Sequence, residues 1–113
     1  MTESINKIVR KTCSVFGISE DDLKSKKRSQ ELVYARMICA KCIDSCCGVY
    51  STTIAKVLDR DSSTIRYYLS FFEQEYFHNK DFRNFADAVN LVSLDIKSDF
   101  HRELEQELNE IIG

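Results

Sequence analysis

The segment Asp61-Ser62-Ser63-Thr64 carries four short polar side chains in a row, directly after the turn Asp59-Arg60. Hydroxyl groups donate and accept hydrogen bonds, a carboxylate accepts from the amino group of cytosine, and a threonine methyl contacts the methyl of thymine. At the exposed start of a helix, such groups suit the reading of base edges in the major groove. Asp61 is also the expected N-cap, because its carboxylate can accept bonds from free backbone N–H groups. The same features fit an ordinary capped amphipathic helix.

The residues that follow predict a helix with one apolar face. Apolar side chains recur there at spacings of three and four, so a core must cover them; they are Ile65, Tyr68, Leu69, Phe72 and Tyr76. The opposite face carries Arg66, Tyr67 and Ser70. Arg66 and Tyr67, with Arg60 in the turn, are weaker candidates for phosphate or base contacts. A solvated role for these three is equally open.

A basic segment from Lys24 to Ser29 interrupts the apolar pattern and predicts a loop. Lys26, Lys27 and Arg28 are candidates for DNA contact, since each neutralised phosphate releases counterions and an arginine in a narrow minor groove senses shape. The alternative is a solvated loop. Arg36, in the helix that follows, fits either a phosphate contact or an ion pair with a neighbour such as Glu31.

Helix-forming patterns continue along the rest of the chain, which has no proline and only three glycines. The capping and stop signals predict five further helical stretches: Ser4 to Gly17, a short turn from Ser19 capped with Asp22, a long central helix from Ser29 to Gly48, a short helix opening at Ser51 or Thr52, and a helix or helical pair from Asp81 to Ile111. The short helix, the Asp59-Arg60 turn and the helix after it form a helix-turn-helix arrangement. The chain is therefore expected to be all-α.

The length of 113 residues suits one domain with a small core. Residues 1–70 carry 12 basic and 8 acidic side chains, whereas residues 71–113 carry 4 basic and 10 acidic ones. A basic front and an acidic tail are compatible with one surface that faces DNA and another that faces away. Chance in a short chain explains the asymmetry equally well.

Four of the five cysteines follow the pattern C-x2-C-x3-C-C at Cys39, Cys42, Cys46 and Cys47. Three of them share one helix face, where thiols behave as small buried hydrophobes, and structural zinc sites usually combine two separated ligand pairs. We therefore expect no metal and no other cofactor. An odd cysteine count without a secretory signal predicts reduced thiols, with Cys47 the most exposed.

No catalytic constellation stands out, because His78 and His101 lack a nucleophile nearby in sequence. The chain is not expected to be an enzyme. No segment is apolar enough to span a membrane, and the N-terminus lacks the apolar stretch of a signal peptide. These features predict a cytoplasmic protein that does not act at a membrane.

The motifs together resemble the DNA-binding C-terminal domain of DnaA, the bacterial chromosomal replication initiator. The likeness rests on the basic segment from Asp22 to Ser29, on Tyr34-Ala35-Arg36 and on Arg60-Asp61-Ser62-Ser63-Thr64-Ile65, and it covers about residues 4–90. It implies an all-α helix-turn-helix bundle of the Trp-repressor-like type, with a helix in the major groove and a basic loop in the minor groove. By position, Arg28 matches the minor-groove arginine, and Asp61 to Thr64 match the base-reading residues. The expected phosphate contacts are Lys26, Lys27 and Arg36.

Four positions depart from the family pattern, and two of them, Tyr67 and Tyr68, replace the smaller residues that often follow the motif. Ser62 stands where histidine is usual, so base preference is expected to differ, and Asp59 replaces a glycine that is common in the turn. No glycine-rich phosphate loop followed by lysine is present, so no nucleotide is expected to bind. The chain is not expected to act as a complete initiator.

The resemblance predicts sequence-specific binding to double-stranded DNA on the bacterial nucleoid, in replication initiation or its regulation. A transcriptional regulator on the same fold is one alternative, and an interaction module that has lost DNA binding is another. We expect residues 1–90 to form the DNA-binding domain and residues 91–113 to add a helical extension to the same compact unit. Residues 81–111 either pair two protomers or pack on their own domain.

Overall fold

Every element of the structure is a helix over the residues it describes. A computed structural model gives the backbone of residues 2–112 and the side chains of residues 2–96, 102 and 104–111. The helices are α1 (Thr2–Phe16), α2 (Glu20–Lys24), α3 (Gln30–Cys47), α4 (Ser51–Leu58), α5 (Ser62–His78), α6 (Lys80–Asn90) and α7 (Val92–Ile112). The all-α prediction is confirmed, and none of these described helices is long and apolar enough to cross a bilayer.

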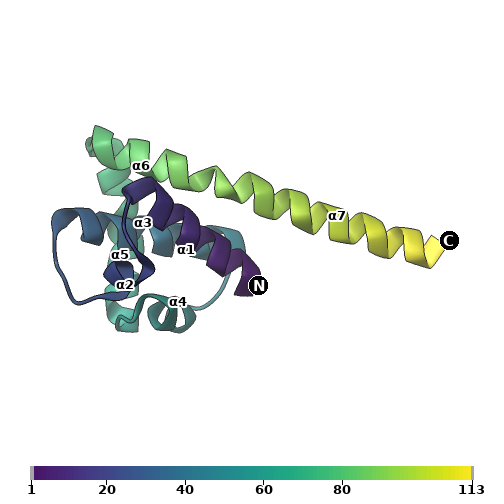
Figure 1. Cartoon of the computed structure of the whole chain (residues 1–113), viewed down its shortest axis with the longest axis horizontal. Helices are drawn as coiled ribbons and strands as arrows, with labels where there is room; N and C mark the ends of the chain where they lie inside the picture. The colour runs from purple at the N-terminus through teal and green to yellow at the C-terminus, as the bar shows by residue number, and fades with distance from the viewer. Residues whose placement is uncertain (1, 113) are drawn as a thin grey trace.

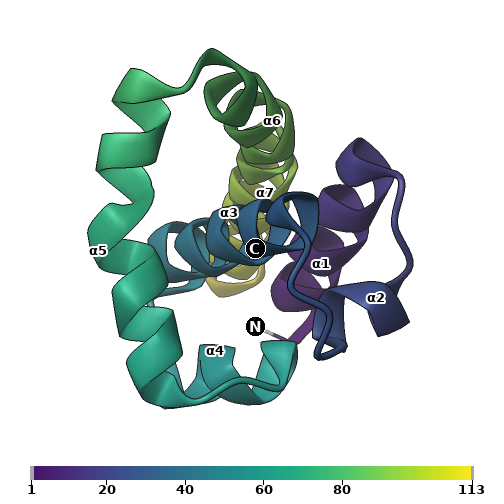
Figure 2. The same cartoon turned by 90° about the vertical axis from the view of Figure 1, so that its left-hand side faces the viewer.

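Helix α3 forms the centre of the bundle, with α1, α4, α5 and α6 packed around it (Figure 2). Its length brings buried side chains to several neighbours, among them Ala35, Ile38 and Ile43, each no more than 2 % exposed. Burial of such side chains is the main source of stability in a domain of this size. Packing on α3 therefore fixes the position of α4 and α5 relative to the basic loop, which directly precedes α3.

Serine and asparagine side chains cap three of the helices. Ser19 Oγ accepts from the Asp22 N–H at 3.0 Å, and Ser29 Oγ accepts from the Leu32 N–H at 3.4 Å, so both predicted caps are confirmed. The predicted caps at Ser4 and Asp81 are wrong. Helix α1 already begins at Thr2, which leaves Ser4 inside it. Asn79 caps α6, since its Oδ1 accepts from the Phe82 N–H at 3.1 Å and Asp81 lies within the helix.

Left-handed residues end three helices. Gly17 and Gly48 have φ values of 66° and 60°, and both were expected as stops. Asp59 ends α4 with φ 52° and ψ 55°, and it is the one non-glycine with positive φ among the described residues. This backbone conformation allows the chain to turn sharply from α4 into α5.

Helix α7 leaves the bundle and projects well beyond it (Figure 1). Its first turns pack on the domain, where Val92 is buried and Ile96 is half-buried. The described side chains from Leu104 to Ile111 are all exposed, and the molecule is 54 Å long but only 27 Å and 25 Å wide. The extension therefore joins the compact unit at its start alone.

The cysteines of α3 lie mainly in the core. Cys39 and Cys42 are buried, as expected for thiols that act as small hydrophobes, while Cys46 and Cys47 are half-buried. Cys42 Sγ lies 3.9 Å from Cys46 Sγ. Burial raises the pKa of Cys39 to about 12. Both Cys39 and Cys42 thus belong to the packing of α3.

Candidate nucleic-acid interface

Helices α4 and α5 form a helix-turn-helix around the residues Asp59 to Asp61. The Arg60 N–H donates to the Ala55 carbonyl at 2.9 Å, which closes the end of α4. Ile54 and Leu58 of α4 and Ile65 of α5 are fully buried in the same core cluster, and the two helices pack on each other. Local backbone bonds and a shared apolar contact therefore set the angle between α4 and α5.

The first turn of α5 presents short polar groups to solvent. Ser63 is exposed, and Ser62 and Thr64 are half-buried. One turn later, Arg66 and Tyr67 are exposed, and the Tyr67 ring packs on Phe71 with ring centroids 4.5 Å apart. The face predicted for base reading is thus open to a partner along two turns of α5.

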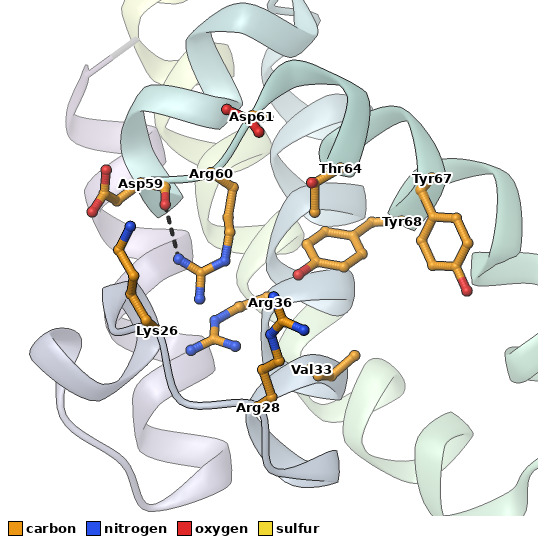
Figure 3. Close-up of a pocket in the computed structure, with 10 residues that line it drawn as sticks. All are labelled: Lys26, Arg28, Val33, Arg36, Asp59, Arg60, Asp61, Thr64, Tyr67 and Tyr68. Atoms are coloured by element: carbon orange, nitrogen blue, oxygen red, sulfur yellow. Dashed lines mark hydrogen bonds between the residues drawn. The ribbon is translucent and has the colours of Figure 1, made fainter.

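Asp61 occupies the N-cap position of α5, but its carboxylate makes no capping bond. The expected carboxylate cap is therefore wrong, although its carbonyl accepts from the Thr64 N–H at 3.0 Å and the Ile65 N–H at 3.2 Å. The exposed carboxylate remains available to a partner. Its side chain lines the same groove as Thr64 (Figure 3).

Arg36 is placed differently from the expected phosphate contact. Its side chain is only 1 % exposed, and its guanidinium donates to main-chain carbonyls of the segment 22–27. A guanidinium has five N–H donors and no acceptor, so several carbonyls can share one such group. Buried and bonded in this way, Arg36 supports the loop from inside, and an ion pair with Glu31 is absent among the described side chains.

Arg60 also turns toward the loop. Its guanidinium donates to the carbonyls of Lys24 and Ser25 and to that of Asp59, the last at 2.8 Å. The sequence suggests Arg60 as a phosphate or base contact, yet its guanidinium donates to main-chain carbonyls of the protein itself. Arg60 is half-buried, so one edge stays accessible.

The three basic residues of the loop point outward. Lys26, Lys27 and Arg28 are all exposed. Lys27 Nζ lies 3.5 Å from Asp22 Oδ1, but an exposed pair of this kind contributes little and exchanges readily. In the part of the chain with described side chains, no carboxylate forms an ion pair with Lys26 or Arg28.

A groove of about 700 Å³ runs between the loop and the helix-turn-helix. Figure 3 shows Arg28, Arg36 and Arg60 converging on its centre from three different segments. Thr64, Tyr67 and Tyr68 form the wall on α5, and Asp59 and Asp61 lie at its rim. The groove therefore carries an excess of positive charge.

Residues 5–70 match a family model described as the helix-turn-helix of the bacterial dnaA protein. The chain belongs to this family. The match covers the basic loop, the central helix and the helix-turn-helix, and it ends within α5. A search of curated proteins found no match.

Membership of the DnaA helix-turn-helix family makes the chain a DNA-binding protein, in a family that is not catalytic. The predicted all-α helix-turn-helix fold is likewise confirmed. Residues 71–113, which complete α5 and form α6 and α7, lie outside the matched region.

The supporting roles of Arg36 and Arg60 were missed by reasoning from the sequence. A signal was present for Arg36, because it lies four residues after Leu32 and three before Cys39, on the apolar face of α3. A charged residue at such a position must be paired or bonded internally. No comparable pattern marks Arg60, since the loop that it contacts lies 35 residues earlier.

Proposed function

We propose that this DnaA-family domain binds double-stranded DNA with sequence preference, through α5 in the major groove and the Lys24 to Ser29 loop in the minor groove. Asp61, Ser62, Ser63 and Thr64 would face base edges, and Arg28 would enter the minor groove. Such a protein would act on the bacterial nucleoid, in replication initiation or its regulation.

The basic groove between the two elements is the observation that carries the proposal. A duplex that offers one groove to α5 and the adjacent groove to the loop must place a sugar–phosphate backbone between them. At that place the chain has a groove of about 700 Å³ lined by Lys26, Arg28, Arg36 and Arg60. Positive groups there neutralise phosphates and fix the register of the protein on the duplex.

The distribution of charge supports the same orientation. Helix α7 holds six of the ten carboxylates found in residues 71–113, and it projects away from α4 and α2 (Figures 1 and 2). Phosphates and this acidic helix would therefore lie on opposite sides of the molecule. Repulsion between them is small once their separation exceeds about 10 Å at moderate ionic strength.

Selection from random duplexes followed by titration tests the proposal. We expect one preferred site, bound with a strong dependence on salt. Replacing Arg28→Ala should weaken binding to that site by about 1 to 3 kcal/mol and relax preference in the minor-groove segment. The matched control is Arg10→Ala, which removes the same charge from an exposed position on α1.

Two outcomes decide the matter. Failure to enrich any duplex would refute DNA reading by this chain. Enrichment with equal losses for Arg28→Ala and Arg10→Ala would remove the loop from the interface. Mapping the selected site onto origin or promoter regions then separates a replication role from a transcriptional one.

Ser62 offers a separate test of base reading. It occupies the first turn of α5, where the family usually has histidine, and its hydroxyl reaches less far than an imidazole. We expect Ser62→His to change the selected sequence at one or two adjacent base pairs, with discrimination of about 1 to 3 kcal/mol. An unchanged selected site would place Ser62 outside the base-reading set.

A further inference from the structure

The carbonyl oxygen of Ser25 accepts hydrogen bonds from two arginines that belong to different elements. Arg36 Nη2 on α3 donates to it at 2.7 Å, and Arg60 Nη2 in the helix-turn-helix turn donates to the same oxygen. We infer that Arg36 and Arg60, here termed the arginine pair, are positioning residues that join the basic loop to the helix-turn-helix as one DNA reader. This inference rests on the proposed function.

The loop has few internal bonds of its own. Between α2 and α3, Ser25 Oγ donates to the Asp22 carbonyl at 2.8 Å and accepts from the Lys27 N–H at 3.3 Å. The Ser25 N–H also donates to the Asp22 carbonyl at 3.2 Å, and Arg36 supplies most of the other bonds to main-chain carbonyls, beside those from Arg60. Arg36 Nε donates to Leu23 at 2.7 Å, and its Nη1 donates to Lys27 at 2.7 Å. The shape of the loop therefore depends on a side chain outside it.

Hydrogen bonds of this kind are strong because a charged donor meets carbonyls in a region shielded from water. Charge-assisted bonds are about twice as strong as neutral ones, and a planar guanidinium loses little freedom when it forms several of them. Lysine offers one compact ammonium and cannot span carbonyls on residues 22 to 27. The arrangement consequently requires arginine at position 36.

Arg60 adds the connection between the loop and α5. It also donates to the Lys24 carbonyl at 3.4 Å, 36 residues earlier in sequence. Arg60 lies one residue before the N-cap of α5, so its backbone moves with the start of that helix. Movement of the loop relative to the first turn of α5 would break these bonds.

The arginine pair also shapes the field in the groove. Burial lowers the pKa of Arg36, and the nearby charge of Arg60 lowers it further. No described carboxylate forms an ion pair with either guanidinium. The positive charge of the arginine pair is thus not neutralised by an ion pair among the described side chains. This charge lies beside Lys26 and Arg28, where the proposed phosphate backbone would lie.

The inference predicts that the contribution of Arg28 depends on Arg60. With Arg60 in place, Arg28→Ala should weaken binding to the selected duplex about tenfold. In an Arg60→Gln background the loop is no longer held to α5, and the same change should cost less than about threefold. Thr64→Ala reports on α5 alone and should cost the same factor in both backgrounds, which a general loss of folding would not produce.

A second measurement needs no DNA. Trypsin cleaves after Lys24, Lys26, Lys27 and Arg28, so its rate on the folded full chain reports how firmly the loop is held. We expect Arg60→Gln to speed cleavage within the loop about tenfold, with the helical circular dichroism unchanged. The matched control Arg10→Gln, which removes an exposed arginine from α1, should leave the rate as it is. Arg36→Met is compared in the same way wherever it retains the helical signal.

Equal Arg28 losses in both backgrounds, together with unchanged loop cleavage, would overturn the inference. If the wild-type chain selects no duplex, the proposed function fails while the cleavage assay still tests the arginine pair. If DNA binds but cleavage and coupling are unaffected, the proposed function stands and the arginine pair has no positioning role.

Discussion

Asp59 has the backbone conformation of a glycine without being one. Its φ of 52° and ψ of 55° lie in the left-handed region, where a Cβ atom crowds the following carbonyl. Aspartate tolerates this region better than most residues because its short polar side chain can bond locally. The helix-turn-helix therefore keeps its sharp turn at a cost in conformational energy.

Substitution at Asp59 tests that cost. We expect Asp59→Gly to raise the free energy of unfolding by up to about 1 kcal/mol, and Asp59→Val to lower it by about 1 to 2 kcal/mol, since β-branched residues are poorly tolerated at positive φ. Urea denaturation measures both. Thr52→Val, an exposed β-branched change within α4, is the control and should shift stability by less than about 0.5 kcal/mol.

Cys39 makes stability depend on alkaline pH. Burial raises the pKa of its thiol to about 12, so the unfolded chain releases this proton first as pH rises. The stabilisation from the protonated Cys39 thiol is complete below about pH 9 and is lost as the pH approaches 12. The total loss in free energy of unfolding is about 4 kcal/mol. In the wild type, the free energy of unfolding should fall more and more steeply as the pH rises through this range.

Cys39→Ala removes this titration and should flatten the dependence by about one proton per molecule. Ser45→Ala, on the exposed side of the same helix, serves as the control. Identical slopes for the wild type and Cys39→Ala would show that the thiol does not remain protonated in the folded state.

At the scale of elements, Asn79 performs two tasks between α5 and α6. Its Oδ1 caps α6, and its Nδ2 donates to the Tyr34 hydroxyl at 2.9 Å, which ties the turn to α3. Asn79→Ala should lower the free energy of unfolding by about 1 to 2 kcal/mol, because it removes a cap and a tertiary hydrogen bond together.

The control for Asn79 is Asn84→Ala, which lies exposed within α6 and should be neutral or slightly stabilising because alanine favours helix. Thermal unfolding of the two variants gives the comparison. A loss at Asn79 no larger than that at Asn84 would mean that neither bond of Asn79 contributes.

Helix positions and apolar faces were largely predictable from the sequence, since glycine stops and serine caps act locally. The errors arose where several capping candidates compete: Asn79 is chosen over Asp81, and Asp61 forms no side-chain cap although its type suits one. Local sequence contains no information on which polar group a neighbouring helix will engage, as Tyr34 does with Asn79.

In the candidate site, too, local features were predictable and contacts between distant residues were not. The exposed loop side chains and the first turn of α5 were found by residue type, whereas Arg36 and Arg60 were assigned to DNA because arginines in a basic region suggest phosphate. Their bonds to the loop join residues up to 36 apart, so only the packed structure reveals them. Sequence reasoning thus identified the exposed side chains that are proposed to face DNA, and it missed the side chains that support them.

For the whole molecule, the distal half of α7 is the least covered part. Leu104, Leu108 and Ile111 are 42 %, 55 % and 81 % exposed, at spacings that place them on one side of the helix. We propose that this exposed apolar stripe pairs with a second copy of the chain, which is one of the two alternatives predicted for residues 81–111. Two protomers would then offer two copies of α5 to adjacent half-sites.

Light scattering across a concentration series tests this pairing. We expect the mass to approach twice 13.1 kDa as concentration rises, and the double change Leu104→Ser with Leu108→Ser to keep it at the monomer value. Asn109→Ser, an exposed polar position between them and Ile111, is the control. A monomeric wild type at all concentrations would leave the stripe without this role.

The bonds that the arginine pair makes to the basic loop end on main-chain oxygens, which every amino acid possesses. Side chains at positions 24, 26, 27 and 28 can therefore be exchanged while the loop keeps its course. Because the bonds to main-chain oxygens set the loop conformation and the side chains at these four positions do not, the loop sequence can be diversified there, whether by evolution or in a randomised library. If the loop enters the minor groove as proposed, new base preferences are accessible there without changes to the rest of the domain.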